Sequence, residues 1–498
     1  MNPMNWSVLS PEILLLAMSC FITLADLFVS SPRRGLTHGL SMITLAAVAA
    51  LHLLGFLEAQ TQYAFGNMVV SDPMGHLLAF FAVVATAVTL IYARPYAASR
   101  EMLKGELHTL ALFALLGILV MISANHFLVI YLGLELMSLS LYALVALRRD
   151  HAPATEAAMK YFVLGALASG FLLYGLSMLY GATGALELGK VFEAIGSGQI
   201  NAQVLVFGVV FIVAGLAFKL GVVPFHMWVP DVYQGAPTAV TLMIAAAPKL
   251  AAFAITIRLL VEGMIGLGKD WQQMLMVLSV CSLVLGNLAA IAQDNLKRLL
   301  AYSTISQLGF MLLGLTPTLI AGNTLSAANG YSSAMFYLVA YVLTTLAGFG
   351  VLLALTQRGF ESEQVSDLAG LNRRSPLMAG IMALVMFSLA GIPPTVGFYA
   401  KLAVLQSLVS TNVPLYIGLA VFAVLLSLIG AYYYLRIVKV MYFDAPATTG
   451  PASGELLLMP TEVRVVLGLN ALLVLGFGLL PGGLMAWCAD AIRMALAT

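Results

Sequence analysis

Five ionisable residues lie inside long apolar stretches of the chain, namely Glu135, Lys160, Lys219, Lys249 and Lys401. A lysine or an acid at the centre of a membrane helix costs about 2.5–3.5 kcal/mol on insertion scales. Such residues usually face the interior of a helix bundle, pair with one another, or mark an ion pathway. We therefore expect these five residues to have a role that compensates for their cost.

Lysine is better suited than arginine to transferring a proton in such a place. The pKa of a lysine amine shifts readily when the amine is desolvated, whereas a guanidinium stays protonated. Burial favours the neutral form of lysine or glutamate, and an opposite charge nearby favours the charged form. The sequence thus predicts that Glu135 and Lys219 form a switch, in which separation releases a proton from the lysine. No arginine is expected in the middle of a membrane helix.

Prolines stand close to three of these lysines. A proline removes one backbone hydrogen bond and frees the carbonyl four residues earlier. Pro224 follows Lys219 by five positions, and Pro248 directly precedes Lys249. Pro393 and Pro394 precede Lys401 by about two turns. Irregular backbone at membrane depth survives only where it lines protein or a watery cavity. These prolines predict helix breaks with polar backbone near the lysines.

Each of these residues also has a structural explanation, which the sequence leaves open. Lys160 begins its segment and could extend its ammonium to the membrane interface. Glu135 and Lys219 could form a static ion pair, and Lys249 and Lys401 could also be static. The acids Asp26 and Asp231, which lie near expected interfaces, are interpreted as solvated.

The histidines offer one further candidate. His226 follows Pro224 on an expected broken helix close to Lys219. Two roles therefore stay open for it: a proton relay, or an ordinary polar side chain with its hydrogen bonds satisfied. The other histidines are interpreted as interfacial: His38, His52, His76, His108, His126 and His151. They provide no convincing pair of axial ligands for haem. Tyrosines, tryptophans and phenylalanines are interpreted mostly as packing residues and interface anchors.

The composition indicates that the solvent of this chain is a lipid bilayer. Of its 498 residues, 61% are hydrophobic and 9% are charged, whereas soluble proteins carry about 25% charged residues. The net charge of +1 gives no reason to expect nucleic acid as a partner. We expect no cleavable targeting peptide, because the N-terminus lacks a basic region and a clear small-residue cleavage site. The three cysteines form no CxxC motif, so no metal site is expected.

Fourteen segments are long and apolar enough to cross the hydrocarbon core, which requires about 20 residues. We expect them at 11–30, 37–57, 73–94, 107–123, 126–147, 157–181, 203–225, 238–261, 272–292, 296–316, 329–356, 377–406, 414–443 and 463–485. The predicted fold class is an all-α integral membrane protein.

The distribution of positive charge predicts the orientation in the membrane. If the N-terminus lies outside, most of the 23 lysines and arginines fall in loops on the cytoplasmic side. Those assigned to the outer side are Lys190, Arg258, Lys269 and Arg493. This asymmetry satisfies the positive-inside rule and supports the alternation of fourteen segments.

Two interrupted segments recur, AGLAFKLGVVPFH (214–226) and SLAGIPPTVGFYAKL (388–402). They lie five expected helices apart, which predicts two five-helix repeats, 107–262 and 271–444. Repeats with an odd number of spans must be inverted, and broken helices at matching places point to ion sites near the midplane. Residues 1–106 then form the first three helices, and 445–498 form the last.

Several motifs carry a resemblance to a known family, the antiporter-like membrane subunits of respiratory complex I, the NADH:quinone oxidoreductase of bacteria. The resemblance covers nearly the whole chain and is nearest to the N-type subunits. The motifs are LSPEILLL (9–16), LGLELMSLSLYAL (132–144), MKYFVLGALASG (159–170), FKLGVVPFHMWVPDVYQGAPT (218–238), LKRLLAYSTISQLGF (296–310) and SLAGIPPTVGFYAKL (388–402). The motif at 218–238 is also shared by multisubunit cation/proton antiporters and membrane-bound hydrogenases.

The resemblance implies roles for particular residues. Glu135 would modulate Lys219, which with Lys249 would carry a central polar axis, and Lys401 would be the terminal lysine. The M-type subunits typically have glutamate at that last position, so lysine favours the N type. Lys160 and His226 would be accessory relays. Relatives commonly carry histidine where this chain has Gln307, so a path there would need water or hydroxyls such as those of Ser303 and Thr304.

The resemblance also implies the setting of the chain. It would be a proton-translocating membrane-arm subunit in the bacterial inner (plasma) membrane, with its N-terminus on the periplasmic side. NADH, FMN, iron–sulfur clusters and quinone would be bound by partner subunits, and no redox site is implied here. Two alternatives stay open: a subunit of a cation/proton antiporter or membrane-bound hydrogenase, and a structural scaffold whose charges are static.

Overall fold

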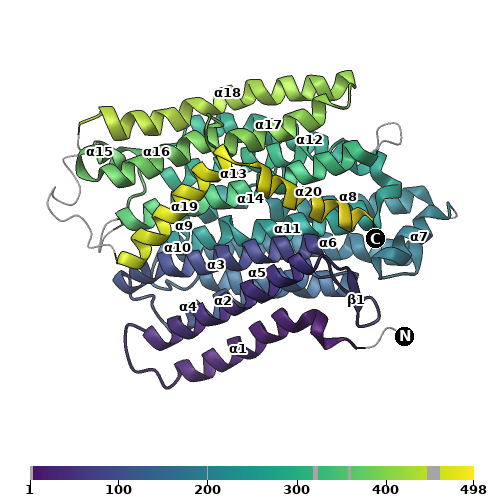
Figure 1. Ribbon diagram of the computed structural model, residues 1–498, viewed down its shortest axis with the longest axis horizontal. Helices are drawn as coiled ribbons and strands as arrows, with labels where there is room; N and C mark the ends of the chain where they lie inside the picture. The colour runs from purple at the N-terminus through teal and green to yellow at the C-terminus, as the bar shows by residue number, and fades with distance from the viewer. Residues whose placement is uncertain (1–3, 199, 318–323, 357–360, 446–459, 498) are drawn as a thin grey trace.

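The computed structural model describes residues 4–198, 200–317, 324–356, 361–445 and 460–497. Its long helices run along one common direction, which is horizontal in Figure 1. Both chain ends lie at the right-hand end of the bundle, together with β1 and α7. We call this the terminal end and the opposite one the far end. Two termini at one end agree with an even number of crossings.

The N-terminal part contains long helices and one small hairpin. Its elements are η1 (Trp6–Leu9), α1 (Ser10–Asp26), α2 (Gly35–Glu58), β1 (Gln62–Ala64), β2 (Val69–Ser71), α3 (Pro73–Ser99), α4 (Gly105–Ile122), α5 (Phe127–Val145) and α6 (Ala152–Thr183). α3 begins where its sequence predicts a start, because the side chain of Asp72 accepts a hydrogen bond from the backbone of Gly75 and Pro73 takes the first helical position.

The central part contains most of the breaks. Its elements are α7 (Leu188–Gly196), α8 (Ala202–Leu220), α9 (Trp228–Gly235), α10 (Thr238–Ala245), α11 (Ala247–Thr256), the π-helix η2 (Ile257–Gly263), η3 (Ile265–Leu267), α12 (Gly268–Ile291) and α13 (Leu296–Leu313). Pro248 stands in the first turn of α11, and Ala246 before it leaves helical geometry. The expected segment 238–261 is therefore interrupted directly before Lys249.

The C-terminal part continues the bundle. Its elements are α14 (Thr324–Leu355), η4 (Val365–Leu368), α15 (Leu371–Arg374), α16 (Pro376–Ala390), α17 (Val396–Val409), α18 (Pro414–Phe443), α19 (Thr461–Leu479) and α20 (Gly482–Leu496). The expected segment 463–485 differs from the structure, because α19 ends before Pro481 and a further helix, α20, continues to the terminal end (Figure 1). Residues 446–459 of the expected unit 445–498 lie outside the described residues.

In the part of the chain that the structure describes, 12 helices meet the length and hydropathy expected of membrane spans. The two other expected segments are also helical. α13 is too polar to be counted among the 12, and the segment 377–406 is divided into the two shorter apolar helices α16 and α17. All fourteen expected segments are thus found as helices or as broken pairs.

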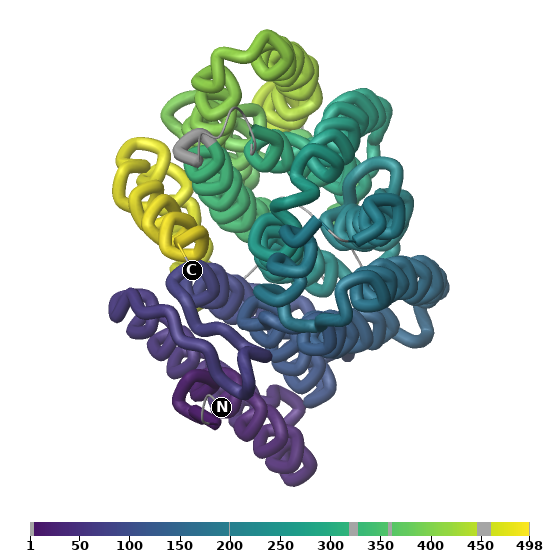
Figure 2. Tube along the Cα trace, turned by 90° about the vertical axis from the view of Figure 1, so that its right-hand side faces the viewer, coloured from purple at the N-terminus to yellow at the C-terminus, as the bar shows by residue number. Residues whose placement is uncertain are grey.

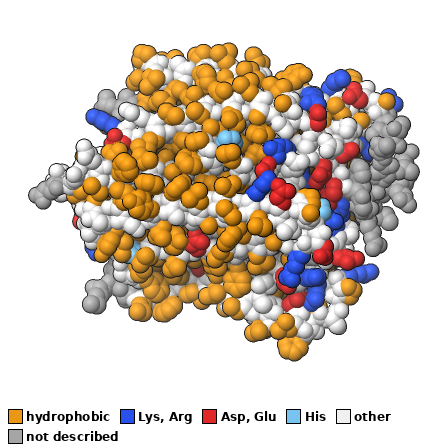
Figure 3. Space-filling model, turned by 180° about the vertical axis from the view of Figure 1, so that it is seen from behind, with side chains coloured by type: hydrophobic (Ala, Val, Ile, Leu, Met, Phe, Trp, Pro, Cys, Tyr) orange, Lys and Arg blue, Asp and Glu red, His pale blue; other side chains and the backbone are white. Residues whose placement is uncertain are grey.

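The surface has the pattern of a membrane protein. Viewed from behind, hydrophobic side chains cover most of the middle of the molecule, whereas charged side chains gather mainly toward one end (Figure 3). Viewed end-on, the chain passes from the N-terminal helices through the central ones to α18, with the C-terminal segment beside them (Figure 2). An apolar surface over the middle of the molecule, with charged groups gathered at an end, fits a bilayer.

Glycines allow helices to approach closely in both halves. A Cβ atom on Gly117 of α4 would lie 2.7 Å from the backbone oxygen of Gly133 in α5. In the second half, a Cβ on Gly286 of α12 would lie 2.7 Å from the backbone nitrogen of Ser306 in α13. Small residues at helix contacts are typical of membrane bundles, because helices there associate by close packing.

Candidate functional site

Two helix breaks with the same backbone geometry lie in the interior. α8 ends at Gly221 and α16 ends at Gly391, with φ angles of 83° and 85°. Each glycine nitrogen bonds the carbonyls three and four residues earlier, and the next nitrogen bonds the carbonyl five residues earlier. This is the Schellman type of helix ending, which requires a left-handed residue and so favours glycine. It leaves the last carbonyls of each helix available to other donors.

Lys249 occupies the carbonyl end of the first break. Its side chain is 1% exposed, and its Nζ donates to the carbonyl oxygens of Lys219 and Leu220, each at 3.0 Å. The ammonium also lies 5.1 Å from the ring centroid of Trp228, whose indole N–H donates to Phe218. The sequence predicted that Pro224 frees the carbonyl of Leu220, and the structure places a lysine on that oxygen.

Lys401 occupies the same place at the second break. Its Nζ donates to the carbonyl oxygens of Leu389 and Ala390, each at 3.0 Å, and to the hydroxyl of Ser427 at 2.8 Å. These two carbonyls are the ones that Pro393 and Pro394 free. The ammonium lies 5.6 Å from the ring centroid of Phe310.

The position of these two lysines has an electrostatic reason. The C-terminus of a helix carries a partial negative charge from its aligned peptide dipoles. A helix that ends inside a bundle brings this charge into a poorly hydrated interior, where it stabilises an ammonium and supplies the acceptors that it needs. The two breaks therefore create two binding places for a cationic lysine, one in each half.

Lys219 and Glu135 lie near each other but do not form an ion pair. Lys219 Nζ donates to the hydroxyl of Ser138 at 2.8 Å, and Ser138 stands one turn after Glu135 on α5. Among the described residues, Glu135 takes part in no ion pair, and its buried Oε1 has no hydrogen-bond partner. The static ion pair left open by the sequence is absent from this conformation, while the switch that the sequence predicted stays a prediction.

Gln307 and a group of tyrosines connect the central helices to the second break. Gln307 Nε2 donates at 2.9 Å to the carbonyl of Leu389, which also binds Lys401, and at 2.9 Å to the hydroxyl of Tyr434. Tyr337 donates to Gln307 Oε1. Ser303 and Thr304 bond to Tyr434 and Tyr341 respectively. These three tyrosines are exceptions to the interpretation of tyrosines as mostly packing residues, and no local sequence pattern signals their hydrogen bonds.

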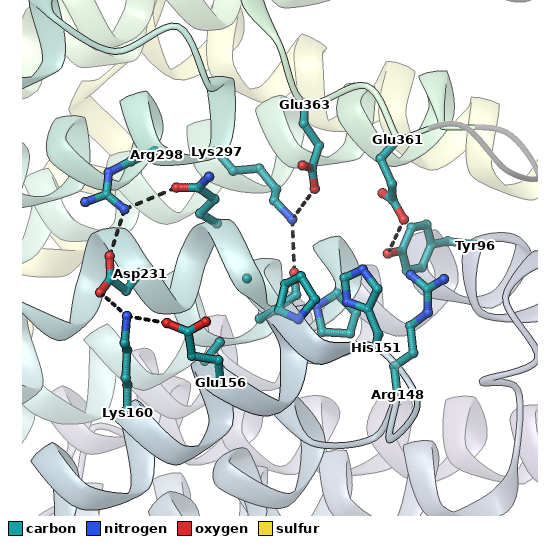
Figure 4. A pocket seen from close by; sticks show the side chains of 16 residues that line it. Tyr96, Arg148, His151, Glu156, Lys160, Asp231, Lys297, Arg298, Glu361 and Glu363 are labelled. Carbon is teal, nitrogen blue, oxygen red and sulfur yellow. Dashed lines mark hydrogen bonds and ion pairs between the residues drawn. The ribbon is translucent and has the colours of Figure 1, made fainter.

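Lys160 lies in a charged cavity of about 430 Å³ at the end of α9. It pairs with Glu156 and Asp231, each at 2.8 Å, and Asp231 also binds Arg298 at 2.7 Å (Figure 4). The side chain of Lys160 is 43% exposed, which agrees with the alternative that its ammonium extends to the membrane interface. Asp231 was interpreted as simply solvated, but it joins α6 to α13.

The same cavity holds further charged groups that the sequence analysis did not single out. Lys297 is 3% exposed, binds Glu363 at 2.8 Å and donates to the carbonyl of Ala236 at 3.0 Å. Glu361 binds Tyr96 and the side chain of Arg100. Figure 4 shows Lys297, Glu361 and Glu363 among the side chains that line this cavity. Charged side chains from α6, α9 and α13 thus line one cavity.

His226 lies in the first break, between α8 and α9. Its carbonyl accepts the hydrogen bond that starts α9, from Val229. Within the described part of the chain, its buried Nδ1 has no hydrogen-bond partner, and no hydrogen bond or ion pair joins it to Lys219. The structure thus does not bring these two residues together, and a relay through His226 stays a prediction.

Arg258 and three of the histidines are buried, which the sequence interpretations did not anticipate. Arg258, which was assigned to the outer side, is 2% exposed near the end of the span Thr238–Gly263. It bonds Asp72 at 2.7 Å and Glu262 at 2.9 Å. The histidines His38, His52 and His108 were interpreted as interfacial, but they are 7%, 3% and 1% exposed. Both differences arise because partners from distant helices compensate the polar groups.

The comparison with known proteins first defines the class. Residues 124–427 match the family described as NADH:quinone oxidoreductase/Mrp antiporter, TM. This range contains both broken helices and the lysines bound to them. The fold is therefore that of an antiporter-like membrane protein.

Full-length relatives identify the family more closely. A protein named NADH-quinone oxidoreductase subunit N from Polaromonas naphthalenivorans (strain CJ2) is 62% identical over 99% of this chain and 98% of its own length. A protein of the same name from Herminiimonas arsenicoxydans is 59% identical over 100% of both chains. The chain belongs to the NADH-quinone oxidoreductase subunit N family.

Solved structures agree with this assignment. A chain of respiratory complex I from Thermus thermophilus with bound aureothin is 32% identical, with a TM-score of 0.79 over 97% of this chain and 100% of that chain. The Mrp complex from Dietzia sp. DQ12-45-1b contains a chain with a TM-score of 0.84 at 20% identity, covering 99% of this chain and 97% of that one. At that identity the likeness concerns the fold alone.

Proposed function

We propose that this chain is a membrane subunit of a bacterial NADH:quinone oxidoreductase and translocates protons through its interior. The observation that carries this proposal is the pair of lysines bound to helix-break carbonyls, Lys249 and Lys401. The relatives named subunit N support the assignment to that complex. Other subunits of the complex would be its partners.

The proposed pathway connects the charged cavity with the two breaks. Protons would arrive through the cavity at Lys160 and Asp231. Glu135 and Lys219, which form no ion pair in this conformation, would influence the charge state of the lysine at the first break. Transfer would continue through Lys249 and the Gln307 network to Lys401. Lys249 and Lys401 can each hold a proton while bound to backbone carbonyls and release it when their surroundings change. A proton-transfer step requires this behaviour.

The setting follows from the same proposal. The chain would lie in the bacterial inner membrane with the terminal end on the periplasmic side, so that the charged cavity opens to the cytoplasm. Segments 107–262 and 271–444 would be inverted repeats, as the matching breaks suggest. NADH, FMN, iron–sulfur clusters and quinone would belong to partner subunits, and this chain would supply only proton transfer.

The experiment that tests the proposal compares Lys219→Ala with Lys190→Ala in the complete complex. Lys190 is a matched control, because its side chain is 66% exposed on α7. We expect Lys219→Ala to slow NADH-driven proton pumping about tenfold, a fraction of what a positioned proton-transfer group typically contributes. Assembly on a native gel should be unchanged. Unimpaired pumping by the assembled Lys219→Ala complex would contradict the proposal.

The Mrp-like fold makes a cation/proton antiporter the second candidate. The same membranes distinguish the two functions. If Lys219→Ala spares NADH oxidation and pumping but abolishes sodium-dependent growth, the chain acts as an antiporter subunit.

A further inference from the structure

A second group of ionisable side chains lies among the N-terminal helices, apart from the lysine axis. It consists of Glu12 on α1, His52 on α2, and Asp72 and His76 at the start of α3. These residues line a cavity of about 10 Å³, which is about the volume that one water molecule requires. No step of the proposed pathway uses them.

The polar atoms around this cavity are deeply buried and incompletely bonded. Glu12 is 7% exposed and His52 is 3% exposed. Within the described residues, Glu12 Oε2 and His52 Nε2 have no hydrogen-bond partner. An unpaired buried polar atom costs about 1–3 kcal/mol, so two of them beside a water-sized cavity indicate a built binding place for a polar species.

The two imidazoles form a continuous connection along the wall of the cavity to Ser71, which also lines it. His52 Nδ1 and His76 Nδ1 are 3.1 Å apart, and His76 Nε2 lies 2.8 Å from the hydroxyl oxygen of Ser71. Ser71 ends β2 and is partly exposed at the terminal end of the molecule. Gly55 makes room for this arrangement, because a Cβ there would lie 2.5 Å from His76.

We propose that Glu12, one water molecule and the His52–His76 pair form a second proton-binding site, which passes protons toward Ser71. The inference rests on the proposed function, since the proton it carries is the one that the complex translocates. It assigns an active part to helices α1 to α3, which the lysine axis leaves without one.

The transfer balances atom by atom. Of the two facing Nδ1 atoms only one carries a hydrogen when both rings are neutral. If His52 carries it, His52 Nε2 is an acceptor and takes a proton from Glu12 through the water. The Nδ1 proton then moves to His76, and His76 releases its Nε2 proton to the Ser71 side. One proton enters at His52 and one leaves at His76.

An ion triad joins this cluster to the helix that carries Lys249. Asp72 lines the cavity and binds Arg258 on η2, which continues α11. π-helical turns frequently occur at functional sites. The charged groups that face the cluster are Glu12, Asp72 and, near His76, Glu58. A movement of Arg258 would therefore alter the electrostatic field at the cavity.

The test uses Glu12→Gln and His52→Gln in the complete complex, with His126→Asn as the control. His126 caps α5 and takes no part in the cluster, and asparagine keeps the cap. The two readouts are proton pumping per NADH oxidised and the NADH-induced infrared difference spectrum. We expect both cluster variants to lose about tenfold in pumping, and to lose carboxyl and imidazole bands that the control retains.

Ser71→Ala provides a variant that leaves the buried groups in place, and it should slow pumping without changing assembly. Normal pumping and an unchanged spectrum in Glu12→Gln, His52→Gln and Ser71→Ala would overturn the inference if Lys219→Ala is impaired alongside them. If Lys219→Ala is also unimpaired, the proposed function fails as well. The two failures are thereby distinguished.

Discussion

At the scale of single residues, the account depends on cationic side chains held by backbone carbonyls. Lys249 and Lys401 each bind two carbonyl oxygens at the end of an interrupted helix. Neither has an acid as its ion-pair partner within the described residues. Their charge is compensated by dipoles, which move less than an acid side chain does. Such sites hold a proton without locking it into a salt bridge.

Gln307 provides a test of the connection between the two halves. The change Gln307→Leu leaves the hydroxyl of Tyr434 and the carbonyl of Leu389 without a shared donor. We expect a loss of about 1–3 kcal/mol of stability, together with slower pumping. Thermal inactivation of the purified complex and proton uptake by its vesicles measure the two effects.

The change Gln307→His serves as the comparison, because imidazole can both donate and accept. It should keep pumping at or above the normal rate. Equal stability and equal pumping in Gln307→Leu would show that this network is not part of the pathway.

The sequence predicted the lysines and free backbone carbonyls near them, but not the hydrogen-bonded tyrosines. A lysine in an apolar run is visible in the sequence because it departs from its neighbours. Tyr434 and Ser303 are 131 positions apart, and a tyrosine in a membrane helix is usually an interface anchor. The buried histidines were misread for the same reason, since His38 pairs with His108 across 70 positions.

At the scale of elements, the interrupted helices position the site. A continuous helix would bond its own carbonyls and leave none for a lysine. Gly221 and Gly391 end α8 and α16 with a left-handed residue, and the prolines prevent the helices from resuming at once. Glycine, proline and lysine therefore act as one unit at each break.

Gly391 allows this dependence to be tested. Alanine there would adopt φ of 85° and place a Cβ 2.8 Å from Lys401 Cδ. The left-handed conformation costs about 1–2 kcal/mol for such a residue, and the contact would displace the lysine. We expect Gly391→Ala to lower both thermal stability and pumping.

Gly380→Ala is the matched control, because it lies in α16 with nothing within 4 Å of its added Cβ. It should be neutral or slightly stabilising, since alanine favours helix more than glycine by about 1 kcal/mol. A Gly391→Ala complex as stable and active as Gly380→Ala would contradict the importance of the break geometry.

Apolar length and prolines predicted the elements well, but they did not predict every interruption. The break before Pro393 follows from the sequence, because two prolines cannot continue a helix. The π-helix Ile257–Gly263 has no such signal, and within it Arg258 binds Asp72, the residue that caps α3. α20 is amphipathic and packs on α14 and α3, so its apolar residues are too few to register as a span.

At the scale of the whole molecule, the N-terminal helices are fastened to the core by the ion triad of Asp72, Arg258 and Glu262. Asp72 is 1% exposed and lies 186 positions from its partner. A buried ion pair is costly to form but still more costly to break, since the remaining charge has no compensation.

Arg258→Leu should therefore destabilise the complex by about 3–5 kcal/mol, which is enough to reduce assembly. Arg493→Leu is the control, because that arginine is 64% exposed. The amount of assembled complex in the membrane measures the effect. Normal assembly of Arg258→Leu would show that the triad does not hold the N-terminal helices.

The most direct test of the central claim is NADH-driven proton pumping by complexes that carry Lys401→Arg, reconstituted in vesicles and checked for assembly. Arginine keeps the positive charge at the second break but does not release its proton. If Lys401 transfers protons, pumping should fall about tenfold although the complex assembles. If pumping is normal with arginine but lost with Lys401→Leu, the charge is static, and proton transfer through this lysine is contradicted.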